Sequence, residues 1–331
     1  MKKILLAVTA ALAITSCSQN EEFDNAGQKA EINFSTVVSK ATRASELTTD
    51  GLKTNGGFKV FAYNTGSDVM TNGIALSESA FMDGVAVTWA STKWNMNPAG
   101  PYYWPLSDNI QFFAYSPATN NVSYTKPDGV KTGYPSFEYS IASTQEDLVV
   151  AYTKNATKPT VSGTPVNLNF KHVLAQINFK LKGKDAGFTY KVTKISLSNI
   201  GNKGTFTYGD PEVNVGSWAS TSGAATYEYT ATYTDFIGIA ELAIKTDANG
   251  LMLMPQTLGE DAKITIAYST TYNGENVFNA TKEVSLKNIV WAAGDKILYT
   301  LLLPGGAEDV TFTPKVDNWN DEKTPEANEA Q

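Results

Sequence analysis

The chain has 331 residues, and its 33 acidic side chains outnumber its 26 basic ones, giving a formal net charge of −7 at pH 7. An acidic surface argues against nucleic acid as a partner. Cys17 is the only cysteine, so an intrachain disulfide is excluded. The length that follows residue 43 predicts two domains of ordinary size.

The first seventeen residues have the pattern of a bacterial lipoprotein signal. Two lysines precede an apolar run from Ile4 to Ile14, which is too short for a membrane-spanning helix of about 20 residues. Small residues then lead into Cys17, whose thiolate can accept a diacylglyceryl group. We therefore predict lipidation at Cys17, and the alternative is an ordinary signal peptide with an incidental cysteine.

Residues 31–44, EINFSTVVSKATRA, read as a β-strand followed by a polar linker. Ile32, Phe34 and Val38 fall on one face of the strand. The linker holds Arg43, which is the only arginine among the 26 basic residues. Small flanking residues make the linker a suitable site for proteolysis, so the sequence predicts cleavage between Arg43 and Ala44.

The remaining chain is rich in alternating strand patterns separated by turn pairs such as Asn72-Gly73 and Asn273-Gly274. Residues 172–181 read as one continuous strand, and residues 251–255 as a short buried strand that ends at Pro255. Helical periodicity is nearly absent, and only residues 77–82 suggest a turn or two of helix. Many short strands predict antiparallel β-sandwiches, with the best domain boundary in the proline-punctuated stretch 153–165.

The tail repeats the pattern of the early strand. Val310, Phe312 and Val316 have the same spacing as the three apolar residues of the early strand, so the two segments can fill one groove at different times. Chance similarity among strands rich in Phe and Val is the alternative. Pro314 lacks a backbone donor and favours an edge or inserted strand.

The sequence offers few residues that could serve in catalysis. His172 is the only histidine and falls on the polar side of its predicted strand, which predicts a surface residue. The acidic pairs at 146–147, 260–261 and 321–322 read as solvated charge. No metal or cofactor motif is present, so we expect neither, and we expect no enzyme activity. Core packing is the expected use of an aromatic group formed by Trp89, Trp94, Tyr102, Tyr103 and Trp104.

Several motifs in order give the chain a resemblance to a known family. They are the lipobox, ATRA, PYYWP, IQFFAYSP, QEDLVVAY, NFKHVLAQINFKL, LMLMPQ, AGDKILYTLLL and VDNW. Together they resemble the fimbrillin-like family of lipoprotein-derived pilins, over essentially the whole chain. The resemblance implies two tandem transthyretin-like antiparallel β-sandwich domains, lipidation at Cys17 and cleavage at Arg43-Ala44 by an arginine-specific outer-membrane protease.

The resemblance also implies a division of the chain and a way of assembly. The expected parts are a signal peptide (1–16), a lipidated propeptide with a removable strand (17–43), two sandwich domains (44–165 and 166–303) and a tail that is a candidate donor strand (304–331). Loss of the strand holding Ile32, Phe34 and Val38 opens a groove. A neighbour's Val310, Phe312 and Val316 would fill it, unless the tail is the last strand of its own domain.

Two functions of different classes follow. The first is a structural subunit of a surface fimbrium, exported to the outer membrane as a lipoprotein, cut and polymerised, in a stalk, tip or accessory role. Its partners would be other pilin subunits, the lipoprotein-processing machinery, the protease and an adhesive ligand. The second is a surface lipoprotein that binds glycans and stays anchored through Cys17. A native N-terminus at free Ala44 favours the first function, and acylated Cys17 favours the second.

Overall fold

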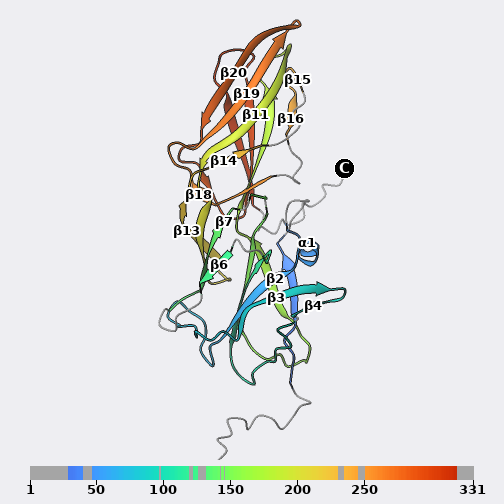
Figure 1. Ribbon diagram of the computed structural model, residues 1–331, viewed down its shortest axis with the longest axis vertical. Coiled ribbons are helices and arrows are strands. Elements are labelled where there is room, and N and C mark those ends of the chain that lie inside the picture. Colours follow the sequence, from blue (N-terminus) through green and yellow to red (C-terminus); the bar gives the residue numbers. More distant parts are fainter. Residues whose placement is uncertain are drawn as a thin grey trace, which may run out of the picture.

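The computed structural model describes residues 29–39, 47–96, 98–118, 122–125, 132–141, 143–144, 146–229, 235–244 and 250–318. The molecule is elongated, with its N-terminal strands at one end and its C-terminal strands at the other (Figure 1). Almost all regular structure in the described ranges is β-strand, which confirms the predicted all-β class. The helix α1 (Thr49–Thr54) is the exception, and the helical turn expected at residues 77–82 does not form.

The N-terminal end is built on a seven-stranded sheet. Its order is β1 (Phe34–Val38), β9 (Val166–His172), β8 (Val149–Ala156), β5 (Ile110–Ser116), β2 (Phe58–Asn64), β3 (Met82–Ala90) and β4 (Lys93–Asn95). Strand β5 lies at its centre and is buried at every position. Because successive side chains point to opposite faces, Phe112 packs in a core on one face and Phe113 in a core on the other.

A four-stranded sheet covers one face of the seven-stranded sheet and joins the two halves of the chain. Its order is β13 (Gly216–Ser222), β12 (Lys203–Tyr208), β7 (Ser136–Ser140) and β6 (Val122–Thr125). The aromatic core between the sheets includes Phe113, Phe137 and Tyr208, and the Tyr208 hydroxyl donates to the Ala114 carbonyl at 2.9 Å. The two halves therefore share both a sheet and a core.

Two further sheets enclose the C-terminal core. One has the order β16 (Glu241–Ala243), β10 (Ala175–Gly183), β22 (Asp295–Leu303) and β23 (Thr311–Asn318), and β17 (Leu251–Leu253) also pairs with β10. The other has the order β14 (Ala225–Glu228), β11 (Phe188–Ile200), β19 (Lys263–Tyr272) and β20 (Glu275–Ser285), and β15 (Phe236–Ile237) also pairs with β11. A two-stranded sheet pairs β18 (Gln256–Thr257) with β21 (Val290–Trp291). Apolar residues of both larger sheets form one cluster.

The continuous strand predicted over residues 172–181 is wrong, because β9 ends at His172 and β10 begins at Ala175. The chain changes sheets at Val173 and Leu174, and Val173 and Ala175 pack in different cores. The predicted boundary between 165 and 166 falls between β8 and β9, which pair with each other. The predicted buried strand near residue 251 is present as β17, with all three residues buried.

Buried tyrosines should make the fold sensitive to alkaline pH. Burial raises the pKa of Tyr63 to about 12 and that of Tyr115 to about 12. An unfolded tyrosine titrates near pH 10, so between about pH 10 and 12 the unfolded state loses protons that the folded state keeps, and stability falls as pH rises. Urea unfolding at about pH 8 and about pH 11 should show this loss, and Tyr115→Phe should reduce it by about 1 kcal/mol. Tyr103→Phe, at a side chain that is 42% exposed, is the control and should leave the loss unchanged.

Candidate functional site: the β1 groove

Strand β1 forms one edge of the seven-stranded sheet and pairs with β9 alone among the described strands. The pairing is parallel, from Phe34 opposite Val166 to Val38 opposite Phe170. Ladder contacts include the Val166 N–H donating to the Asn33 carbonyl at 2.7 Å. The strand lies where the sequence predicts one. We call the space that it fills, between β9 and the core below, the β1 groove.

The side chains of Ile32, Phe34 and Val38 are all buried in the core beneath the sheet. The Phe34 ring makes edge-to-face contacts with Phe58 and Phe112, with centroids 5.7 and 5.8 Å apart. In contrast, Val37 on the opposite face is 58% exposed. The predicted apolar face of this strand is therefore its core-facing side.

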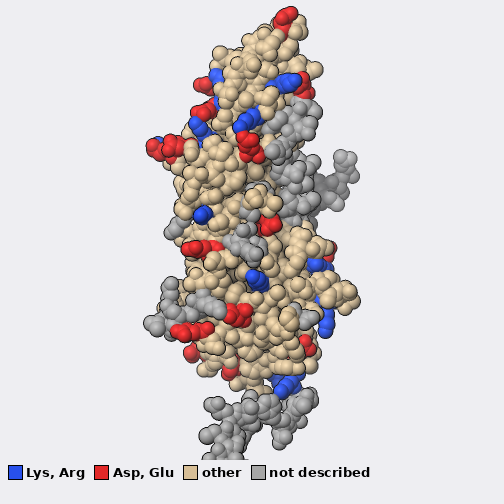
Figure 2. Space-filling view, in the orientation of Figure 1, with Lys and Arg blue, Asp and Glu red and all other residues tan. Residues whose placement is uncertain are grey.

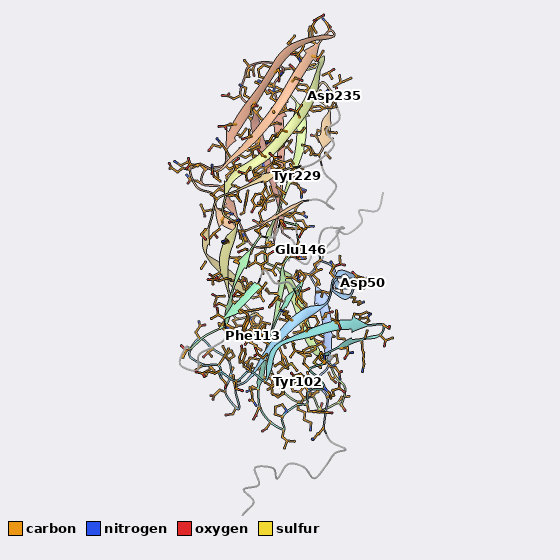
Figure 3. All side chains as sticks on the ribbon, in the orientation of Figure 1. Asp50, Tyr102, Phe113, Glu146, Tyr229 and Asp235 are labelled. Atoms are coloured by element: carbon orange, nitrogen blue, oxygen red, sulfur yellow. The ribbon has the colours of Figure 1, made fainter. Side chains whose placement is uncertain are left out.

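Backbone contacts also hold the start of this segment. The Ile32 N–H donates to the Tyr102 carbonyl at 2.8 Å, and the Trp104 N–H donates to the Ala30 carbonyl at 3.0 Å. Figure 3 labels Tyr102 near the lower end of the molecule and Glu146, next to Asp147, near its middle. We call residues 29–39 the β1 segment. It runs between these two regions, because the carbonyl oxygen of Ser39 contacts His172, which in turn contacts Asp147.

His172 is buried, with 1% of its surface exposed, so the prediction of a surface residue is wrong. The alternation that applies to His172 is that of β9, in which Val166, Leu168 and Phe170 share its buried face. The alternation of β10 does not continue back through the break at Val173, so it assigns His172 to the wrong face.

Asp147 is also buried, at 5% exposure, which corrects its assignment as solvated charge. Its Oδ2 lies 2.7 Å from Nδ1 of His172 and accepts a hydrogen bond from the Leu47 N–H at 3.1 Å. The other ring nitrogen, Nε2, lies 3.1 Å from the Ser39 carbonyl oxygen. His172 thus contacts Ser39 and Asp147 contacts Leu47, on the two sides of Arg43 in the sequence.

The tail forms β23, an edge strand that pairs antiparallel with β22 of the same chain. The edge position agrees with the expectation from Pro314. Val310 is buried, Phe312 is half-buried with its ring 5.3 Å from the Tyr299 ring, and Val316 is 54% exposed. The other side chains from Thr311 to Asp317 are exposed. The apolar face of β23 is therefore less well buried than that of β1.

Other predicted sites have mixed outcomes. Cys17, Arg43 and Ala44 lie outside the described residues. Trp94 and Trp104 are buried in the core as expected, whereas Tyr103 is 42% exposed.

No group of three or more His, Cys, Asp or Glu side chains in the described ranges is placed to hold a metal, and none of the described helices is long and apolar enough to span a membrane. Acidic and basic side chains are interspersed on the face shown in Figure 2.

Comparison with known proteins gives consistent results. The model of the fimbrillin-like family matches residues 42–319. The fimbrium subunit Fim1C of Phocaeicola vulgatus is 27% identical over 98% of this chain and 98% of its own length. A crystal structure of a fimbrial protein from Bacteroides vulgatus has the same fold, with a TM-score of 0.65 and 23% identity, covering 88% of this chain and 99% of that one. The chain belongs to the fimbrillin-like family.

Proposed function

We propose that the protein is a fimbrial subunit that polymerises by strand exchange, in which β23 of one copy replaces the cleaved β1 segment of another. The observation that carries the proposal is the placement of β1. The strand supplies three buried apolar side chains to the core, yet pairs with one neighbour in the described sheet and precedes the only arginine in the chain.

Removing the β1 segment would expose apolar pockets in the core and leave backbone groups of β9 without partners. Each large apolar side chain buried there contributes about 1.5–3 kcal/mol, and Ile32, Phe34 and Val38 would all be lost. The Val166 N–H and the Phe170 carbonyl, which now bond to Asn33 and Ser39, would also lose their partners. A strand from another molecule can restore both sets of contacts, as in other cases of β-strand addition.

Strand β23 is the best candidate for the incoming strand within this chain. It repeats the spacing of the three apolar side chains, and it is an edge strand whose outward N–H and C=O groups are available for pairing. Most of its side chains are exposed, so few buried side-chain contacts are lost when β23 leaves its own sheet. The partners are thus other subunits of the same family.

The proposal includes export as a lipoprotein through Cys17, transfer to the outer membrane and cleavage after Arg43 by an arginine-specific protease. The lipobox and the unique arginine support these steps, and the family match begins at residue 42, so it leaves out the β1 segment. Stalk, tip and accessory positions in the fibre are all compatible with this pathway.

Mass spectrometry of the N-terminus tests the proposal directly. Protein sheared from the cell surface should begin at Ala44, and the cell-bound precursor should begin at acylated Cys17. If the sheared and assembled material retains Cys17, the chain is an anchored surface lipoprotein, and a glycan-binding role becomes the better explanation.

The Phe34→Ala variant should separate the precursor from the assembled subunit. Loss of a buried phenylalanine costs about 3–5 kcal/mol in a core, so the uncut precursor should lose stability of about that size in urea unfolding. Assembled fibres, from which Phe34 has been removed, should melt as the wild type does. Val37→Ala, at an exposed position of the same strand, should change neither measurement, and a matching loss in assembled fibres would show that β1 is retained.

A further inference from the structure

The buried pair of Asp147 and His172 lies where the β1 groove ends. The parallel ladder between β1 and β9 finishes with Val38 opposite Phe170. The next residue, Ser39, donates from both its N–H and its hydroxyl to the Phe170 carbonyl, each at 2.9 Å. Its own carbonyl faces Nε2 of His172 at 3.1 Å. The end of the groove, at Ser39, is therefore polar, whereas the pockets for Ile32, Phe34 and Val38 are apolar.

The contacts of the imidazole indicate its hydrogen-bonding state. Nδ1 faces a carboxylate oxygen of Asp147 and Nε2 faces the Ser39 carbonyl oxygen, and both of these are acceptors. A carbonyl oxygen can only accept, so Nε2 carries the N–H that donates to Ser39. The contact of Nδ1 with Asp147 holds the ring in the orientation that this donation needs.

We propose that the Asp147–His172 pair anchors the end of any strand in the β1 groove, by binding the main-chain carbonyl that follows the third buried apolar side chain. In the precursor this carbonyl belongs to Ser39, after Val38. In the incoming strand the equivalent residue is Asp317, which follows Val316. Every residue offers a main-chain carbonyl, so the pair can bind a strand there whatever side chain that residue carries.

This contact has a physical use in the groove. Ile32, Phe34 and Val38 hold the strand by their buried side chains, and the contact of Nε2 with a main-chain carbonyl holds the residue that follows them. Asp147 also holds the Leu47 N–H, so the chain after the proposed cleavage site remains fixed when the β1 segment leaves. This inference rests on the proposed strand exchange.

Two synthetic peptides isolate the carbonyl contact. Both begin at Lys29. One ends in Ser39 amide, and the other ends in a 2-hydroxyethylamide on Val38, which keeps the N–H and the hydroxyl of Ser39 but lacks its carbonyl. The full-length chain is cut at Arg43 with an arginine-specific protease, and each labelled peptide is exchanged for the cut fragment. The peptide with the carbonyl should bind the wild type about tenfold more tightly, as expected for one buried hydrogen bond.

Variants of the pair decide whether this preference comes from His172. His172→Leu should bring the ratio of the two affinities close to one, and His172→Gln, which keeps an N–H donor of similar reach, should restore part of it. Thr270→Val is the matched control, because it removes one buried side-chain hydrogen bond, from Thr270 Oγ1 to the Gly305 carbonyl at 2.6 Å, in the other half of the molecule. The control should keep the wild-type ratio. A tenfold ratio that persists in His172→Leu overturns the inference.

The incoming strand is tested in the same way. A peptide of residues 307–317 that ends in Asp317 amide is compared with one that ends in β-alanine, which keeps the N–H and the carboxylate but lacks the carbonyl. Wild type should again prefer the carbonyl, and His172→Leu should not; equal binding to wild type overturns the assignment of Asp317. If no peptide of either set displaces the cut fragment, the removable strand itself is wrong, and the proposed function fails with this inference.

Discussion

Arg43→Ala should leave a full-length, lipid-bound, monomeric protein. Arg43 is the only arginine in the chain, so no second site is available to an arginine-specific protease. Arg43→Lys should have nearly the same effect, because the planar guanidinium and the lysine ammonium present different charge and hydrogen-bond geometry to a specificity pocket. N-terminal mass spectrometry should find almost no Ala44 terminus, and fibre incorporation should fall close to background.

Lys40→Ala is the control for this prediction, since it removes a nearby positive charge and leaves the arginine in place. It should be processed and assembled like the wild type. Normal levels of the Ala44 terminus in either Arg43 variant would show that the protein matures by another route.

Phe312→Asp should produce a folded, cleavable subunit that no longer adds to a fibre. In the proposed exchange Phe312 takes the position of Phe34 between Phe58 and Phe112, and an aspartate there would place an unpaired charge in an apolar pocket. The polymerisation rate should fall by at least about tenfold, since roughly 2 kcal/mol or more of binding would be lost. The monomer should melt only a few degrees lower, because Phe312 is half-buried at an edge of its own sheet.

Thr313→Asp gives the matched control, because Thr313 is exposed on the same strand. It should polymerise at close to the wild-type rate. Deletion of residues 307–331 should likewise leave a folded protomer that cannot be linked onward. If the truncated protein melts tens of degrees lower, β23 is an integral strand of its own domain, and the donor-strand assignment is wrong.

Local patterns in the sequence predict some elements well. The alternation of Ile32, Phe34 and Val38 placed the buried face of β1 correctly, and the doubly apolar residues 251–253 predicted a strand buried on both sides. Helix α1 was missed because six residues are too few to show a helical period. Its start nevertheless has a local signal, since the Thr48 hydroxyl accepts a hydrogen bond from the Gly51 N–H.

The buried pair could not be found from local patterns. Asp147 and His172 are 25 residues apart, and their contact depends on the end of β9 meeting the turn before β8. The parallel pairing of β1 with β9 joins residues more than a hundred positions apart, and alternation does not specify which strands pair. The break at Val173 and Leu174, which the predicted continuous strand lacks, is enough to reverse the orientation of His172.

The shared sheet has a consequence for how a fibre bears load. Strand β7 comes from the N-terminal half of the chain and β12 from the C-terminal half, and they pair antiparallel from Lys203 opposite Ser140 to Thr207 opposite Ser136. Figure 1 shows β7 and β13 between the two ends of the molecule. Tension applied to the two ends is therefore carried by these hydrogen bonds as well as by the chain that runs from β9 to β10 through Val173 and Leu174. The aromatic rings of Phe137 and Phe206 stack on the same pair of strands, with centroids 5.1 Å apart. A subunit joined in this way should transmit force as one stiff rod and should not unfold at a linker.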